Sequence, residues 1–160
     1  MPQHATSPNF LQKLAALERQ VAALQRSQAQ PADELPFFPT NLQTMPYQSY
    51  TSFTTAWETI LTPRTSKLSL GLVAIGDQVS AVNTGGEWQV LFDTTVVMSG
   101  TVAATFSYQF AAQVLDLTPY LANTELKVLI QARRTSGAST GGKFGAGGSI
   151  GIAPRYAKLL

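Results

Sequence analysis

The stretch that decides the fold of this chain is residues 126–133, Leu-Lys-Val-Leu-Ile-Gln-Ala-Arg. Its apolar residues Leu126, Val128, Ile130 and Ala132 alternate with residues that are mostly polar. Successive side chains of a β-strand point to opposite faces of the sheet. The alternation therefore predicts a strand that places one face in a core and the other in solvent.

The same alternation recurs along the chain, at residues 67–72 and 88–93. Further strand candidates are 53–61, 96–98, 102–113 and 150–153, with turns at 83–86, 99–100 and in the Gly-rich segment after residue 136. Seven or eight strands with turns every 8 to 14 residues, and no helix-length stretch between them, predict a mainly β fold. We expect an antiparallel, jelly-roll-like β-sandwich, with Trp57 and Trp88 in the core or between the sheets.

The amino-terminal region has a helical period instead. Its apolar residues follow one another at spacings of 4, 3, 4 and 3 and form a seam at heptad positions a and d: Phe10, Leu14, Leu17, Val21 and Leu24. A helix of this length is marginal alone, so its apolar stripe predicts a partner from another chain. The alternative is an amphipathic helix docked on its own domain.

The charges beside the seam predict a parallel homotrimer. Lys13 falls at position g and Glu18 at position e, where Lys13 of one helix reaches Glu18 of the next. Residues 13–18 also resemble the short trimerisation motif of three-stranded coiled coils, with Lys13 where that motif usually has Arg.

Three regions follow from these patterns. Residues 1–28 form an N-terminal trimerising coiled-coil helix, and residues 49–160 form the β-sandwich. Between them, residues 29–48 contain four prolines, which predict an extended linker because proline interrupts both helices and central strands. Phe37 and Phe38 are apolar, so we expect them to pack on the sandwich or on an adjacent subunit.

Composition narrows the function. Charged residues make up only 12% of the chain, about half the globular average, which suits an assembly component or a domain that touches sugars. The absence of cysteine excludes disulfides, thiolate metal sites and cysteine nucleophiles. No apolar run is long enough to span a bilayer and the first residues lack a secretory signal. We therefore expect that the protein is made in the cytoplasm, remains there or leaves as part of a larger particle, and does not insert into a membrane.

The basic residues gather at the carboxyl-terminal end. Residues 126–160 contain six basic and no acidic groups: Lys127, Arg133, Arg134, Lys143, Arg155 and Lys158. An anionic partner is one interpretation, and solubilising charge on strand edges and loops is the other. We favour the second and expect no specific nucleic-acid partner.

No motif predicts catalysis or a cofactor. Residues 137–144 nearly match a phosphate-binding loop, but Phe144 replaces the hydroxyl that would bind magnesium. We therefore expect a partner-contact loop that includes Lys143 and Phe144. The single histidine, His4, permits no histidine-based triad within one chain, and a carboxylate pair is the only enzymatic alternative among these residues: Glu58, Asp77, Glu87, Asp93, Asp116 and Glu125.

Residues 115–130 resemble a passage of galactose-binding-like jelly-roll domains. The matching residues are Leu115-Asp116-Leu117-Thr118-Pro119-Tyr120-Leu121, then Asn123 and the strand from Leu126 to Ile130. The resemblance implies a one-turn corner that leads into a core strand. It is a structural signature, and it does not extend to that family's ligand loops.

The arrangement of helix, proline-rich neck and Thr/Ser/Gly-rich sandwich resembles bacteriophage virion appendages, such as minor tail proteins, tail fibres and head-decoration fibres. This resemblance implies a non-enzymatic homotrimer in the virion that contacts other virion proteins and presents its sandwiches to a host-surface glycan or stabilises the particle. The alternative is a cellular carbohydrate-binding module whose helix joins an unrelated partner.

Overall fold

The computed structural model describes residues 10–27, 37–39, 47–137 and 148–160. The chain divides into two compact units, Met1–Pro31 and Ala32–Leu160, and we call the second unit the head. In the first unit, helix α1 spans Phe10–Ser27, which confirms the predicted N-terminal helix. The described part of the head consists of strands, loops and one 3-10 turn, η1, at Thr118–Tyr120.

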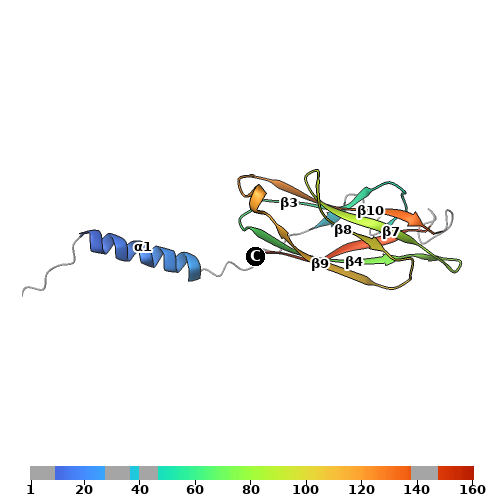
Figure 1. Ribbon diagram of the computed structural model, residues 1–160, viewed down its shortest axis with the longest axis horizontal. Coiled ribbons are helices and arrows are strands. Elements are labelled where there is room, and N and C mark those ends of the chain that lie inside the picture. Colours follow the sequence, from blue (N-terminus) through green and yellow to red (C-terminus); the bar gives the residue numbers. More distant parts are fainter. Residues whose placement is uncertain (1–9, 28–36, 40–46, 138–147) are drawn as a thin grey trace, which may run out of the picture. The chain divides into compact units, whose positions relative to one another are not determined.

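The head is built from two antiparallel sheets, which Figure 1 shows as two layers. The five-stranded sheet has the order β1 (Phe38–Pro39), β3 (Thr54–Leu61), β10 (Leu126–Ser136), β7 (Gly85–Phe92) and β8 (Thr95–Val102). The four-stranded sheet has the order β2 (Tyr47–Gln48), β11 (Ile150–Leu159), β4 (Lys67–Gly76) and β9 (Gln109–Asp116). A separate hairpin joins β5 (Gln78–Val79) to β6 (Val82–Asn83). The predicted mainly β, antiparallel fold is confirmed.

The alternating segments supply one core shared by both sheets. In β4, Leu68 and Leu70 are fully buried, and in β10 the buried positions run from Leu126 to Ala132 at every second residue. Phe92 in β7 is also fully buried. Burying one such large side chain contributes about 1.5–3 kcal/mol. The apolar side chains that the period of two predicted are therefore the main source of the stability of the head.

Both tryptophans lie where the sequence places them. Trp88 is buried in the core on β7. Trp57 on β3 donates its indole N–H to the carbonyl oxygen of Ile152 on β11 at 2.6 Å, which links the two sheets. This bond fixes the indole ring at the boundary between the layers, because a half-buried indole N–H needs an acceptor.

Two predicted turns are wrong. The dipeptide Ser99-Gly100 lies within β8, where Gly100 is paired with Trp88. A Cβ atom on Gly100 would lie 2.5 Å from the indole ring of Trp88, so the glycine leaves room for the ring and does not turn the chain. Gly86 likewise lies within β7, and a Cβ atom there would meet the carbonyl oxygen of Arg133 at 2.3 Å.

The last strand is longer than predicted. β11 continues through Pro154, although the sequence suggested that the strand ends at Ala153. The ladder with β4 shifts register between Pro154 and Tyr156. Pro154 borders this bulge, in which Arg155 is unpaired, so the residue that lacks an N–H lies next to an interruption of the ladder.

Part of the predicted linker belongs to the head. Phe37 packs against the core, as expected from its apolar character. Phe38–Pro39 pairs with Glu58 and Trp57 as β1, and Tyr47–Gln48 pairs with β11 as β2. The remaining residues of the segment 29–48 lie outside the described ranges.

Candidate functional site

The apolar seam of α1 is exposed. The exposed fraction is 46% for Leu14, 61% for Leu17 and 46% for Val21, and all three follow the heptad spacing along one helix face. Lys13 and Glu18 are exposed beside them. The side chains of Phe10 and Leu24 lie outside the described part. A stripe of three exposed aliphatic side chains on one face is typical of a helix that packs on another element.

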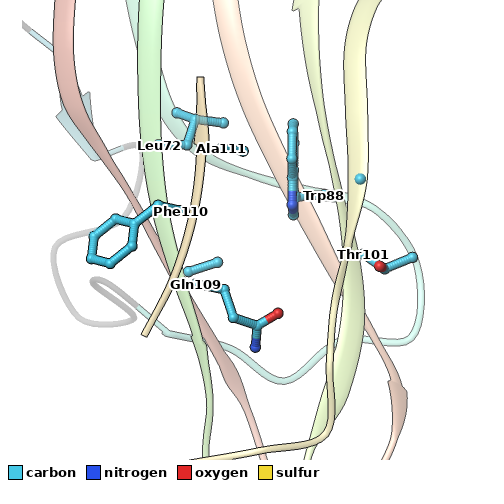
Figure 2. A pocket seen from close by; sticks show the side chains of 8 residues that line it. Leu72, Trp88, Thr101, Gln109, Phe110 and Ala111 are labelled. Carbon is cyan, nitrogen blue, oxygen red and sulfur yellow. The ribbon is translucent and has the colours of Figure 1, made fainter. Parts of the chain in front are cut away.

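A narrow cleft lies on the head between the outer strands β8 and β9 (Figure 2). It has a volume of about 180 Å³, and its lining comprises Leu72, Ala74, Trp88, Gly100, Thr101, Gln109, Phe110 and Ala111. Figure 2 shows the indole of Trp88 facing Leu72 across the cleft, while the ring of Phe110 points away on the other side of β9. None of the described residues that line the cleft has a charged side chain.

Aromatic residues surround the start of β9. Phe106 and Tyr108 are 62% and 69% exposed, and Phe110 is 64% exposed. The amide side chain of Gln109 holds the preceding loop, because it accepts the N–H of Ala103 at 2.9 Å and donates to the Ala103 carbonyl at 3.2 Å. This exposed aromatic cluster was not predicted from the sequence. Its period of two was visible within the predicted strand 102–113, but the pattern alone cannot tell a core face from an exposed one.

A second, shallower hollow lies on the outer face of the five-stranded sheet. Its volume is about 320 Å³, and its lining comprises Phe53, Glu87, Trp88, Gln89, Val96, Ser99, Gly100 and Thr101. The amide of Gln89 donates to Gln131 at 2.7 Å, and Gln131 donates to the Thr55 hydroxyl at 3.1 Å. We call this hollow the polar groove, because Gln89, Ser99 and Thr101 contribute an amide and two hydroxyls to its lining.

One ion pair borders the polar groove. Arg133 donates from Nε and Nη2 to Oε2 of Glu87 at 2.9 and 2.7 Å, and its guanidinium group lies 4.6 Å from the centre of the Phe53 ring. Both charged side chains are more than a third exposed, so solvent screens their attraction. The pair therefore positions groups at the groove more than it stabilises the head.

Three of the candidate carboxylates, those of Asp77, Asp93 and Asp116, accept hydrogen bonds from backbone N–H groups. Asp93 has a φ of 54° in the turn between β7 and β8 and accepts the N–H of Lys127 at 3.1 Å. Asp77 is buried and accepts the N–H of Gln78 at 2.8 Å. In the described ranges, no group of three or more His, Cys, Asp or Glu residues is placed to bind a metal ion.

The third, Asp116, forms the corner that the sequence resemblance implied. Its carboxylate accepts the backbone N–H of Thr118 at 2.9 Å, where η1 begins. Hydrogen bonds from the Thr118 hydroxyl and N–H hold the pKa of the Asp116 carboxyl below its usual value, and the charge of Lys67 lowers it further. Glu87, by contrast, forms the ion pair with Arg133.

The basic residues of the C-terminal part do not form one patch. Lys127 and Arg133 lie on β10 of the five-stranded sheet, whereas Arg155 and Lys158 lie on β11 of the other sheet. Lys143, with the predicted contact residue Phe144, lies outside the described ranges. The distribution fits charge spread over both faces better than a binding surface for one anionic polymer.

Comparisons with known proteins do not identify a family for this chain. No protein-family model matches the chain, and no curated protein matches it. A chain from the "Structure of infectious bursal disease virus Gt strain" is similar at 18% identity and a TM-score of 0.30. The match covers 79% of this chain and 30% of that one, and a likeness at this level bears on neither fold nor function. Among the described residues, no helix is both long and apolar enough to cross a membrane.

Proposed function

We propose that this chain is a non-enzymatic structural protein that forms a homotrimer through α1 and displays three heads, as a virion tail fibre, minor tail protein or capsid-decoration protein does. The observation that carries the proposal is the exposed seam of Leu14, Leu17 and Val21. An isolated helix of 18 residues is marginal in water, and packing on an equivalent helix both buries this stripe and stabilises the helix.

The strand order of the head supports a jelly roll within this proposal. When the eight strands of a jelly roll are lettered B to I along the chain, its two sheets have the orders B-I-D-G and C-H-E-F. The same orders arise here if β2, β3, β4, β7, β8, β9, β10 and β11 take the letters B to I, with β1 as an additional strand beside C. Jelly rolls occur in viral capsid proteins and in lectins, so the fold is compatible with the proposal without selecting it.

The charges that flank the seam provide a test of a parallel homotrimer. Lys13→Glu and Glu18→Lys should each weaken association, since each places like charges at the e and g positions of neighbouring helices. The double variant should recover the wild-type trimer, and each exposed pair should contribute about 0.2–1 kcal/mol. Sedimentation equilibrium and thermal unfolding of α1 would measure the effect.

Only a parallel arrangement brings Lys13 of one helix to Glu18 of the next, so recovery in the double variant is specific to it. Additive weakening of the two single changes would argue against the parallel trimer. A wild-type protein that is monomeric would favour the alternative, in which the helix docks on its own head.

A second candidate function, attachment to a neutral glycan, is favoured by the polar groove. Sugar hydroxyls bind to amide and hydroxyl groups, which Gln89, Ser99 and Thr101 supply, and the apolar faces of sugar rings pack on aromatic rings such as that of Phe53. Three heads on one trimer would multiply weak contacts to a repeated sugar.

Titrating the protein with neutral glucose, galactose and N-acetylglucosamine oligomers should shift the backbone amide NMR signals of the groove strands β7 and β8. Gln89→Ala should weaken the binding at least several-fold, because it removes a groove amide. Gln113→Ala, an exposed glutamine on the other sheet, is the matched control and should bind as the wild type does. Equal losses in both variants, or shifts confined to residues other than β7, β8 and Phe53, would count against the groove.

A further inference from the structure

Strand β9 is an outer strand of the four-stranded sheet. It pairs along its whole length with β4, and in the described part of the chain no second strand pairs with its other side. Half of the backbone N–H and C=O groups of an outer strand face away from the sheet and can pair with a further strand. We call this side of Gln109–Asp116 the β9 edge.

The β9 edge lacks the features with which natural proteins prevent such pairing. It contains no lysine and no proline, and its first charged residue is Asp116 at the end. Its ladder with β4 has no register shift, whereas the ladders of β10 with β3 and of β11 with β4 are each interrupted by one. A regular eight-residue edge whose one charged residue lies at its end is suited to receive another strand.

Apolar side chains extend along this edge. Phe110 and Val114 are 64% and 51% exposed and lie on the outer face of the sheet, with the exposed Ala112 between them. The guanidinium group of Arg155 lies 4.9 Å from the centre of the Phe110 ring and covers part of it. Exposed phenylalanine and valine on an unprotected edge are typical of an interface.

We propose that β9 pairs in antiparallel fashion with β9 of a second copy, about a two-fold axis at Ala112. In this register Phe110 lies opposite the partner's Val114, and Val114 lies opposite the partner's Phe110. The outward side chains of both strands then share one face, as the period of two requires. The pairing joins the four strands of each copy into one continuous sheet.

The sequence of β9 favours a second copy over a foreign strand, because it is self-complementary. The register creates two equivalent aromatic and β-branched cross-strand pairs, a stabilising combination. At its centre small alanines face each other, and the one charged residue of the strand, Asp116, lies opposite the partner's Tyr108, so no like charges meet. An isologous two-fold contact of this kind is the commonest interface between identical chains.

The two-fold contact adds a function to the proposed trimer. Three β9 edges related by a three-fold axis cannot pair with one another two by two, so each must pair with an edge of another trimer. Three-fold and two-fold contacts together give either a closed assembly, of which the hexamer is the smallest, or an open network. The β9 edge therefore links trimers, and it also pairs isolated chains if the helix does not trimerise.

Sedimentation equilibrium of four full-length proteins separates the two interfaces. The wild type should form hexamers or larger multiples of the trimer, and Val114→Lys should leave trimers alone. Leu17→Asp with Val21→Asp should form dimers through β9, and all three changes together should give monomers. The control is Val82→Lys on the β5–β6 hairpin, a similarly exposed valine that should assemble like the wild type.

A monomer for Leu17→Asp with Val21→Asp, up to millimolar concentration, overturns the pairing of β9 whatever the state of the helix. A Val114→Lys protein that keeps the wild-type mass also overturns it. Amide hydrogen exchange can be measured on the wild type, so its result does not depend on whether a variant folds correctly. In the wild type, every second amide of β9 should become at least ten-fold better protected as concentration rises, and protection that is independent of concentration would assign the edge to another occupant.

Discussion

In a protein that carries Val114→Lys, replacing Leu17 and Val21 by aspartate should convert the trimer into a monomer. Both residues are close to half exposed or more in the single chain, and trimerisation would bury them. Burial of such an aliphatic side chain contributes about 1.5–3 kcal/mol, and each aspartate would bring three carboxylates together on the three-fold axis. A seam of about two and a half heptads cannot absorb both losses, so we expect dissociation at all practical concentrations.

The measurement is sedimentation equilibrium, with Val114→Lys present in every protein so that the β9 edge does not contribute. Gln12→Asp with Ala16→Asp is the matched control, because it places two aspartates at the same spacing on exposed positions outside the seam. The control should remain trimeric. If both variants are monomeric, charge on the helix and not the seam is responsible, and a monomeric parent protein would remove the trimer from the proposal altogether.

Phe92→Ala should have the largest effect on the head. Phe92 is fully buried in β7, and its ring meets that of Tyr120 edge to face, with centres 5.3 Å apart. Replacing a buried phenylalanine by alanine lowers the free energy of unfolding by about 3–5 kcal/mol, because the cavity does not close completely. Small domains have only about 5–15 kcal/mol in total, so the variant should be near the limit of folding.

Urea unfolding followed by the fluorescence of Trp57 and Trp88 would report this loss, since both lie in the head. Phe106→Ala is the matched control. Phe106 is 62% exposed in the loop before β9, and its loss should change stability by less than about 0.5 kcal/mol. Equal effects of the two substitutions would contradict the assignment of Phe92 to the core.

The sequence predicted well those segments in which the spacing of apolar residues fits only a strand or only a helix. In residues 126–132 the alternation identified a strand and its buried face, because a chain that buries every second side chain adopts the β period. The helix was equally clear from its heptads. The polar groove was missed, because Phe53, Gln89 and Thr101 meet only when β3, β10, β7 and β8 pair.

Glycine and proline were misread for a physical reason. In the sequence, Gly100 and Pro154 are signals for a turn and for a strand end. In the structure, Gly100 makes room for the ring of Trp88, and Pro154 lies beside a bulge within β11. The sequence shows only that glycine lacks a side chain and that proline lacks an N–H group. The neighbouring strands determine whether such a residue ends a strand or is accommodated within it.

By itself, the sequence determined the class of each segment: a heptad helix at the amino terminus, then strands whose apolar residues form an antiparallel head. These properties depend on side chains near one another along the chain, so local periodicity is sufficient to identify them. The tertiary structure alone decided which faces stay exposed. Phe110 and Val114 have the same period of two as the buried residues of β10, but β9 is the last strand of its sheet and no described layer covers its outer face. Burial is a property of the neighbouring strands and not of the pattern, which is why the β9 edge became visible only in the folded head.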